Sequence, residues 1–286
     1  MSDARILDRG YRKYQGDRSG VGGAVRSVAW HTVRSILGLG RKGRHKVFPV
    51  IVIAVAFIPS VAFLAISILL RDLGEEVRPE YWEFFGFSFL AALVFTALVA
   101  PEAIVRDRRD GMYALYLSTP LTRVTYLTAK VIAVLGTLSI IVVGPALLAF
   151  LGYTFQGLGP EGFASWFGVG ARVVLAGIAI SVVYTAVSLG ASSLTDRRAF
   201  ASVAVILLML GLSIAASLMV EAAGMSSSLQ LIDPLGTPLE LPARFFGDRT
   251  EEYRDVATVP VVLANVGWVV AGAAMITYRY RRLAAV

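Results

Sequence analysis

The sequence predicts an all-α integral membrane protein with six transmembrane helices. Apolar residues make up 56% of its 286 residues, charged residues only 16%, and the mean hydropathy is +0.69. A soluble domain of this length would carry more charge on its surface. Here the apolar residues form six blocks, and a helix needs ~20 such residues to cross the ~30 Å hydrocarbon layer. The blocks are about 47–70, 84–105, 126–152, 167–194, 199–220 and 256–278.

Basic residues concentrate on one side of these spans. Of the 27 lysines and arginines, 21 fall within residues 1–46, 106–130, 195–198 and 279–286, whereas the loops on the other side hold 5. Loops rich in lysine and arginine stay in the cytosol. We therefore expect a multi-pass protein of a bacterial-type plasma membrane with both termini cytosolic. The net charge of +7 is then a topology signal, and no nucleic-acid partner is expected because the basic residues flank spans.

The first 46 residues are expected to lie in the cytosol, as a polar tail followed by an amphipathic helix in the membrane interface. Basic residues then lead into the first span, where they can bind anionic membrane lipids. Residues 47–279 are expected to form the six-span transmembrane domain, and residues 280–286 a cytosolic C-terminal tail. On a helical wheel, one side of the amphipathic helix gathers Val25, Val28, Ala29, Thr32 and Ile36.

The longest outer loop spans residues 221–255 and contains a turn signal at residues 233–238. The segment that follows, residues 239–246, is expected to be a short amphipathic helix that dips into the outer membrane interface. In the first outer loop, Tyr81 and Trp82 fall where an interfacial aromatic belt is expected.

Composition and motifs exclude several kinds of chemistry for this chain. It has no cysteine, which excludes disulfides, thiolate zinc sites and cysteine nucleophiles. Residues 38–45 have the glycine spacing of a phosphate-binding loop, but Arg44 and His45 replace the required Lys and Ser/Thr. We therefore expect no nucleotide, cofactor or metal site and no catalytic residue in this chain.

Three polar residues inside the spans are candidates for function, because charge in a membrane is costly. Glu102 can gate a pathway, pair with a basic neighbour such as Lys130, or serve as an interfacial cap. Arg172 can contact an anionic part of a substrate, or extend its long side chain to the lipid headgroups. Asn265 is expected to form an interhelical hydrogen bond.

The charged segment between the second and third spans is the most informative part of the chain. Residues 106–117 are expected to form one short helix, which residues 118–120 end, and Thr122 can cap the helix that follows. Met112, Leu115 and Tyr116 share a face of the short helix. An apolar face surrounded by charge suits docking into a groove of a partner; the alternative is an ordinary solvated loop.

This segment resembles the permease subunits of type-2 ABC transporters. That family has an acidic-basic cluster and a glycine between spans two and three, then an apolar segment, a Thr-Pro turn, an aromatic residue and a lysine. Residues 107–111 (DRRDG), residues 115–123 (LYLSTPLTR), Tyr126 and Lys130 match this order. The layout also matches: an amphipathic N-terminal helix, six spans, both ends inside and a large last outer loop. Asp107 stands where many members have glutamate.

The resemblance implies a function and a set of contact residues. The chain would be the transmembrane subunit of an ATP-driven exporter, with its substrate pathway at the interface with a second copy or a homologous permease chain. Two copies of a cytosolic ABC ATPase subunit would bind ATP and Mg. Residues 106–123 would be the coupling helix, and residues 195–198 a smaller second contact. The implied ATPase-coupling residues are Arg108, Arg109, Asp110, Gly111, Met112, Leu115, Tyr116, Arg197 and Arg198.

Two other functions stay open at this stage. Asp107 and Asp110-Gly111 have the initial spacing of the CDP-alcohol phosphatidyltransferases, membrane enzymes of lipid metabolism whose carboxylates hold a divalent metal. The rest of that pattern is missing, because Leu115 and Val124 occupy positions where the family has other residues. A secondary transporter is disfavoured because the sequence indicates neither paired carboxylates nor broken helices near the midplane of the membrane.

Overall fold

The computed structural model describes residues 19–39, 43–71, 78–118 and 120–282. Most of the expected N-terminal tail, Arg41, Lys42 and residues 72–77 of the first outer loop lie outside these residues. All regular structure in the described part is helical, and six helices are long and apolar enough to cross a membrane. The predicted all-α, six-span architecture is therefore confirmed. The six are Lys46–Leu70, Phe89–Arg109, Arg123–Phe155, Phe163–Ser193, Arg198–Ala222 and Thr258–Arg282.

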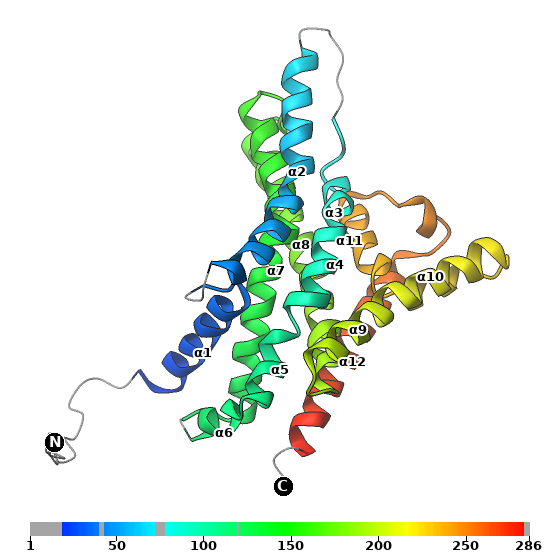
Figure 1. Cartoon of the computed structure of the whole chain (residues 1–286). Helices are drawn as coiled ribbons and strands as arrows, with labels where there is room; N and C mark the ends of the chain where they lie inside the picture. Colours follow the sequence, from blue (N-terminus) through cyan, green and yellow to red (C-terminus); the bar gives the residue numbers. More distant parts are fainter. Residues whose placement is uncertain (1–18, 40–42, 72–77, 119, 283–286) are drawn as a thin grey trace, which may run out of the picture.

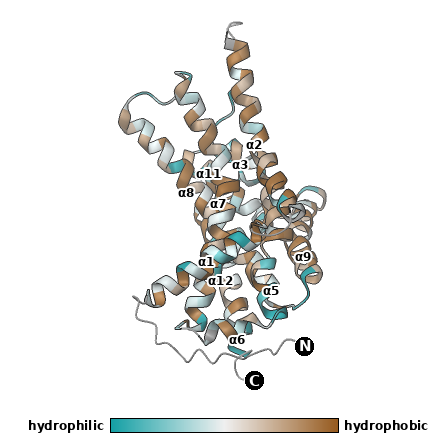
Figure 2. Cartoon of the chain, turned by 60° about the vertical axis from the view of Figure 1, so that its left-hand side comes forward, coloured by the Kyte–Doolittle hydropathy of each residue, from teal (hydrophilic) through white to brown (hydrophobic). Residues whose placement is uncertain are grey.

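Three long helices form the centre of the bundle: α7 (Arg123–Phe155), α8 (Phe163–Ser193) and α12 (Thr258–Arg282). α7 and α8 run side by side through the molecule, and α2 (Arg44–Arg71) packs on α7 (Figure 1). Figure 2 shows hydrophobic residues along the long helices and hydrophilic residues near α5 and α6, at one end of the molecule. This colouring matches helices that face lipid along their length.

Glycine sets the close packing of α8 on α12. A Cβ atom added at Gly272 would lie 2.3 Å from the carbonyl oxygen of Ala186, and one added at Gly190 would lie 2.8 Å from the Cα atom of Gly272. Small residues let two membrane helices approach closely where larger side chains would collide. These glycines therefore fix where α8 and α12 touch.

The N-terminal helix α1 (Gly20–Ile36) has its apolar side toward the bundle. Val28, Ala29, Thr32 and Ile36 are buried, and the helix packs against α7 and α5. The sequence predicts that the apolar side of α1 lies in the membrane interface, but α7 and α5 cover much of this side.

Spans two and five, which the sequence predicts as continuous helices, are interrupted. Span two consists of α4 (Phe89–Val94), the π-helix η1 (Phe95–Val99) and α5 (Glu102–Arg109), and the short helix α3 (Glu83–Phe87) precedes it. Pro101 lies at the break and has no N–H group to donate along the helix. Span five alternates in the same way between α9 (Arg198–Ile206), the π-helix η2 (Leu207–Gly211), α10 (Leu212–Ser217) and the π-helix η3 (Leu218–Ala222).

The last outer loop folds back onto the bundle. It contains η4 (Ser227–Ile232), α11 (Gly236–Phe246) and η5 (Glu251–Tyr253). The short amphipathic helix expected over residues 239–246 lies within α11, and most of α11 is buried against α8, α12 and α3. Tyr184 donates a hydrogen bond to the Leu235 carbonyl at 2.8 Å. Asn265 donates to the Thr237 carbonyl at 3.2 Å, which confirms the interhelical bond expected for Asn265.

Candidate functional site

The segment between spans two and three forms two helices. α5 ends at Arg109, and α6 (Met112–Leu117) begins after Asp110 and Gly111. The prediction of one helix over residues 106–117 is therefore wrong. Gly111 has a φ of +68°, a left-handed conformation that ends helices and favours glycine. The Asp110 amide still donates to the Arg106 carbonyl at 2.9 Å, so the turn is tight.

The expected cap at the start of α7 is confirmed. The Thr125 amide donates to the Thr122 hydroxyl at 3.3 Å, and the Thr122 amide donates to the Thr125 hydroxyl at 2.8 Å. This reciprocal pair satisfies two amides that the first turn of a helix leaves without partners. It fixes the direction in which the chain leaves α6 and enters α7.

A buried ion pair joins α5 to α7 just above this turn. The Lys130 Nζ atom lies 2.6 Å from the Asp107 Oδ2 atom, and only 2% of the Lys130 side chain is exposed. The Tyr126 hydroxyl donates to the same carboxylate oxygen at 3.0 Å. Lys130 also donates to the Thr32 hydroxyl of α1 at 2.9 Å. A buried charge is tolerated when it is paired and hydrogen-bonded, and this group holds α1, α5 and α7 together.

Four tyrosine rings pack around the ion pair. The ring of Tyr126 lies 5.3 Å from that of Tyr113 and 5.6 Å from that of Tyr116, and the rings of Tyr113 and Tyr280 are 5.2 Å apart. The Lys130 Nζ atom lies 5.4 Å from the centre of the Tyr126 ring. Burial raises the pKa of the Tyr113 and Tyr116 hydroxyls, so both stay neutral. Tyr116, expected on the docking face, is thus half-buried against its own chain.

Arg108 connects the same segment to the second inner loop. Its guanidinium donates to the carbonyls of Ser192 at 2.9 Å and Ser193 at 2.6 Å, and to that of Thr195. It also pairs with Asp196 at 3.4 Å. A cation at the end of a helix satisfies carbonyls and offsets the helix dipole. Arg108, expected as a contact residue, therefore points into its own chain and caps α8.

Asp196 extends this connection to the last span. Its carboxylate lies 3.5 Å from the Arg279 guanidinium on α12. The inner turn and the ends of α5, α8 and α12 thereby share one network of charges. No local sequence pattern predicts this position of Arg279, because its partner Asp196 lies far away in the chain.

Glu102 pairs with Arg198. Their Oε2 and Nη1 atoms are 3.4 Å apart, and Arg198 also donates to the Leu98 carbonyl at 3.3 Å. Glu102 thus pairs with a basic neighbour, as suggested, and this neighbour is Arg198, whereas Lys130, the example given, binds the Asp107 carboxylate. Arg198, expected in the second contact, is thus tied to span two.

The remaining expected contact residues form an open surface beside these networks. Leu115 is 58% exposed, and Met112 is half-buried beside it. The exposed residues of this surface are Arg109, Asp110, Gly111, Leu115 and Arg197. We call these five residues and Met112 the inner surface. It offers one large apolar side chain surrounded by charge.

Arg172 lies far along α8 from Ser193, the end that Arg108 caps. It is exposed, and its guanidinium lies 6.0 Å from the centre of the Phe246 ring of α11. Its position near the start of α8 separates it from the inner surface.

The metal-binding interpretation of Asp107 and Asp110 conflicts with their contacts. Asp107 is bound by Lys130 and Tyr126, and Asp110 pairs with Arg106 at 3.3 Å. Within the described residues, no group of three or more acidic, histidine or cysteine side chains could hold a metal ion. The two carboxylates already neutralise basic side chains, which leaves no built site for a divalent cation.

The six apolar helices define a polytopic membrane protein, in which ion pairs and hydrogen bonds join the two inner loops. A family described as ABC-2 family transporter protein matches residues 54–283, which include both inner loops. The chain belongs to this family, the permease subunits of type-2 ABC transporters. Such a subunit carries out transport, is not itself catalytic and works with an ABC ATPase subunit. A comparison with curated proteins finds no match.

Proposed function

We propose that this chain is the transmembrane subunit of an ATP-driven exporter of a bacterial-type plasma membrane, with both termini cytosolic. Two cytosolic ATPase subunits bind ATP and Mg and press on the inner surface. The chain itself binds no nucleotide. The observation that carries this proposal is the position of Arg108, which joins the segment beside the inner surface to the second inner loop. A partner that moves one loop therefore moves both.

Buried contacts connect the two inner loops to four helices, so a movement of the loops would displace these helices. Asp107 of α5 binds Lys130 of α7, and Lys130 also binds Thr32 of α1. Arg108 binds carbonyl groups at the end of α8 and also pairs with Asp196, and Asp196 pairs with Arg279 of α12. Packed helices and buried pairs move as rigid units, so a displacement of α6 becomes a rotation of the bundle.

A second copy, or a homologous permease chain, completes the pathway. Span five is poorly covered by its own chain: only 17% of its apolar window is buried. In Figure 1, α10 extends away from the bundle. An apolar face of this kind faces lipid or a partner chain. In the exporter, the substrate passes between the two permease chains, and ATP binding and hydrolysis switch the access of that path.

The test is Leu115→Asp in the complete transporter, reconstituted in vesicles with its ATPase subunits. A carboxylate in an apolar groove, and the loss of one buried anchor, cost ~2 kcal/mol or more, so binding of the ATPase should weaken more than tenfold. Transport and stimulated ATP hydrolysis should fall together, while membrane insertion is unchanged. Leu39→Asp is the control, since Leu39 is also apolar and exposed (41%) but lies outside both inner loops.

Asp110→Asn separates this proposal from the lipid-enzyme alternative in the same assay. A metal-dependent transferase would lose all activity, whereas a permease should lose only part of its coupling. If Leu115→Asp leaves ATP-driven transport at the level of Leu39→Asp, the inner surface does not bind the ATPase and the proposal fails.

A further inference from the structure

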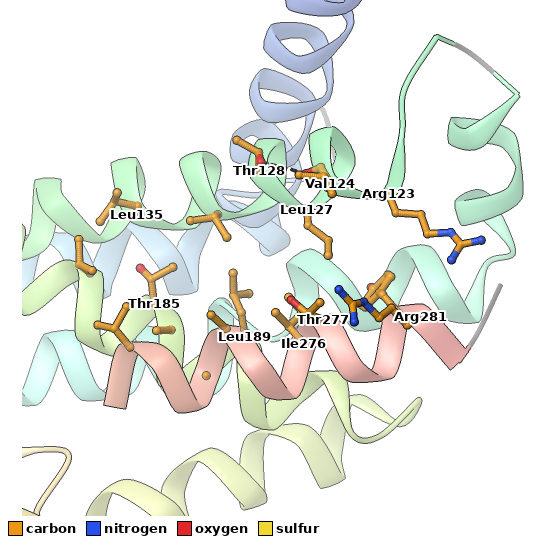
Figure 3. A pocket seen from close by; sticks show the side chains of 17 residues that line it. Arg123, Val124, Leu127, Thr128, Leu135, Thr185, Leu189, Ile276, Thr277 and Arg281 are labelled. Carbon is orange, nitrogen blue, oxygen red and sulfur yellow. Dashed lines mark hydrogen bonds between the residues drawn. The ribbon is translucent and has the colours of Figure 1, made fainter. Parts of the chain in front are cut away.

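An open apolar groove of about 510 Å³ runs between α7, α8 and α12 (Figure 3). Its volume falls within the range of ~300–1,000 Å³ that is typical of small-molecule sites. The walls are aliphatic and include Leu127 and Val131 of α7, Leu189 of α8 and Ile276 of α12. None of the residues of the inner surface lines this groove, so the groove and the inner surface are separate sites.

Positive charge gathers at one end of the groove. Figure 3 shows the guanidinium groups of Arg123 and Arg281 at the same end, with Leu135 and Thr185 toward the other. Both arginines are exposed, and neither forms an ion pair with a described residue. Two unpaired guanidinium groups form a site for an anion such as phosphate, which arginine binds in a planar, forked geometry.

The length of the groove matches one leaflet of a membrane. From Arg123 to Leu135, α7 advances 12 residues, which is about 18 Å at 1.5 Å per residue. Half of the hydrocarbon layer is ~15 Å thick. A molecule with its anionic group at the arginines would therefore place an apolar chain through one leaflet along the groove.

We propose that the groove binds one anionic phospholipid, with its phosphate at Arg123 and Arg281 and an acyl chain along the apolar wall. Assignment to the cytosolic leaflet rests on the orientation proposed above; the binding itself does not. That leaflet is rich in anionic lipid and attracts basic residues next to spans. A helix of a second chain is the rival occupant, but the two arginines at one end of the apolar groove favour a molecule that carries an anionic group and an apolar chain.

A lipid in this position would influence the inner networks. Tyr280 lines the groove, its ring packs against that of Tyr113, and the Arg108 guanidinium lies 5.8 Å from the centre of the same Tyr280 ring. The lipid would bridge the start of α7 and the end of α12, which both adjoin the network of Arg108 and Asp196. Occupancy should therefore stabilise the inner end of the bundle.

The first experiment measures lipid binding to the full chain, purified in detergent and stripped of lipid, by native mass spectrometry and thermal unfolding. Phosphatidylglycerol should bind at least tenfold more tightly than phosphatidylcholine and raise the melting temperature. The double variant Arg123→Gln/Arg281→Gln should lose this preference. Arg282→Gln is the matched control, because Arg282 neighbours Arg281 but packs over the Tyr278 ring, 4.5 Å from its centre. Equal binding of the two lipids would overturn the proposal.

The second experiment tests the acyl chain. Ala273→Leu narrows the groove without a change of charge and should weaken phosphatidylglycerol binding severalfold, whereas Ala274→Leu, an exposed neighbour outside the lining, should not. Glycerol phosphate, which carries the headgroup chemistry alone, should not raise the melting temperature. If Ala273→Leu binds the lipid as wild type does, or if glycerol phosphate stabilises equally, the groove is not an acyl-chain site.

A single cysteine tests the rival occupant. The chain has no cysteine, so Thr277→Cys places one thiol in the groove lining. Efficient disulfide cross-linking of two copies through this thiol would show that a second chain fills the groove, and the lipid proposal would fail. Because none of these measurements uses ATP, their outcome is independent of the Leu115→Asp test of coupling.

Discussion

Two regions of the molecule bury ion pairs, one near α5 and the other in the loop that contains α11. Near α5, Lys130 and Asp107 come from different spans, and Thr32 of α1 completes the group. In the loop, Glu240 and Arg244 lie one turn apart on the same helix. Both pairs are almost completely enclosed, since the Lys130 side chain is 2% exposed and that of Glu240 is 0% exposed.

The remaining partners of the loop pair are also close in sequence. Arg244 donates to the carbonyls of Tyr253 at 2.8 Å and Val256 at 2.9 Å, and the Thr250 hydroxyl donates to Glu240 at 2.5 Å. These bonds close one loop on itself. The pair near α5 instead determines how three separate helices are placed relative to one another.

The two pairs should therefore differ in the effect of their loss. A buried ion pair adds little net stability compared with a well-packed apolar pair, because both ions lose their hydration. The main effect of such a pair is to fix the relative positions of the segments that it joins. We expect the loop pair to affect only the stability of the loop, and the pair near α5 to affect both stability and the coupling to the ATPase.

Lys130→Met should have the largest effect. It leaves the Asp107 carboxylate buried without its cation, and such a change typically costs ~3–5 kcal/mol. The double variant Asp107→Asn/Lys130→Met should recover most of this stability, because no unpaired charge remains. Stimulated ATP hydrolysis should stay low in both variants, since the link from α5 to α7 is lost. Thermal unfolding and ATPase assays on the complete transporter measure the two effects separately.

Glu240→Gln provides the matched change in the loop pair. Arg244 keeps its two carbonyl partners, so the expected cost is ~1–3 kcal/mol. ATP hydrolysis per folded transporter should be normal. Uncoupling of the ATPase by Glu240→Gln would contradict the expectation that the loop pair affects only stability. Normal coupling in Asp107→Asn/Lys130→Met would contradict the role in coupling expected for the pair near α5.

Arg108→Lys should have an intermediate effect. It tests whether the cap that Arg108 forms on the end of α8 contributes to stability and coupling. Lysine keeps the charge but cannot reach the carbonyls of Ser192 and Ser193 together, because it lacks the planar fork of arginine. We expect a loss of ~1–3 kcal/mol and a severalfold lower stimulation of ATP hydrolysis. Arg109→Lys is the control: Arg109 is exposed, and a surface change of this kind typically alters stability by less than ~0.5 kcal/mol. Equal stability of the two variants would show that the cap on α8 is unimportant.

The sequence predicts the features of this fold that depend on local patterns. The six spans follow from the length of the apolar blocks, and the Thr122 cap follows from residue type and spacing alone. The break at Asp110-Gly111 is also local, since this dipeptide is a strong turn signal. This signal alone indicates a break between α5 and α6.

Contacts between distant parts of the chain were not predictable. Glu102 and Lys130 lie near the same end of neighbouring spans, and this position alone favours an ion pair between them. The partners found, Arg198 for Glu102 and Asp107 for Lys130, depend on how the helices are rotated. The burial of α11 has the same origin: its amphipathic pattern specifies an apolar face, while Tyr184 and Asn265 on other helices specify what covers it.

The smallest expected effect concerns the pH dependence of the outer loop. Asp233 is 3% exposed, and burial raises the pKa of its carboxyl, although hydrogen bonds from the Leu235 amide at 2.7 Å and the Ser213 hydroxyl at 3.0 Å act in the opposite direction. Burial also raises the pKa of the Glu252 carboxyl, and the charges of Asp233, Glu221 and Glu240 act in the same direction.

A folded-state pKa above the unfolded value means that the folded loop binds the proton more tightly. This contribution to stability is present below the unfolded pKa, near 3.9 for aspartate, and is lost as the pH rises through the folded pKa. Asp233→Asn keeps an oxygen for the Leu235 amide but cannot lose a proton. The melting temperature of wild type should therefore fall, relative to Asp233→Asn, as the pH rises above about 4. Glu252→Gln is the control for the second carboxyl, and an unchanged difference between wild type and Asp233→Asn across this range would contradict the prediction. A strong effect of the same pH change on ATPase stimulation would also remove the distinction between the two buried pairs, because it would show that the loop takes part in coupling.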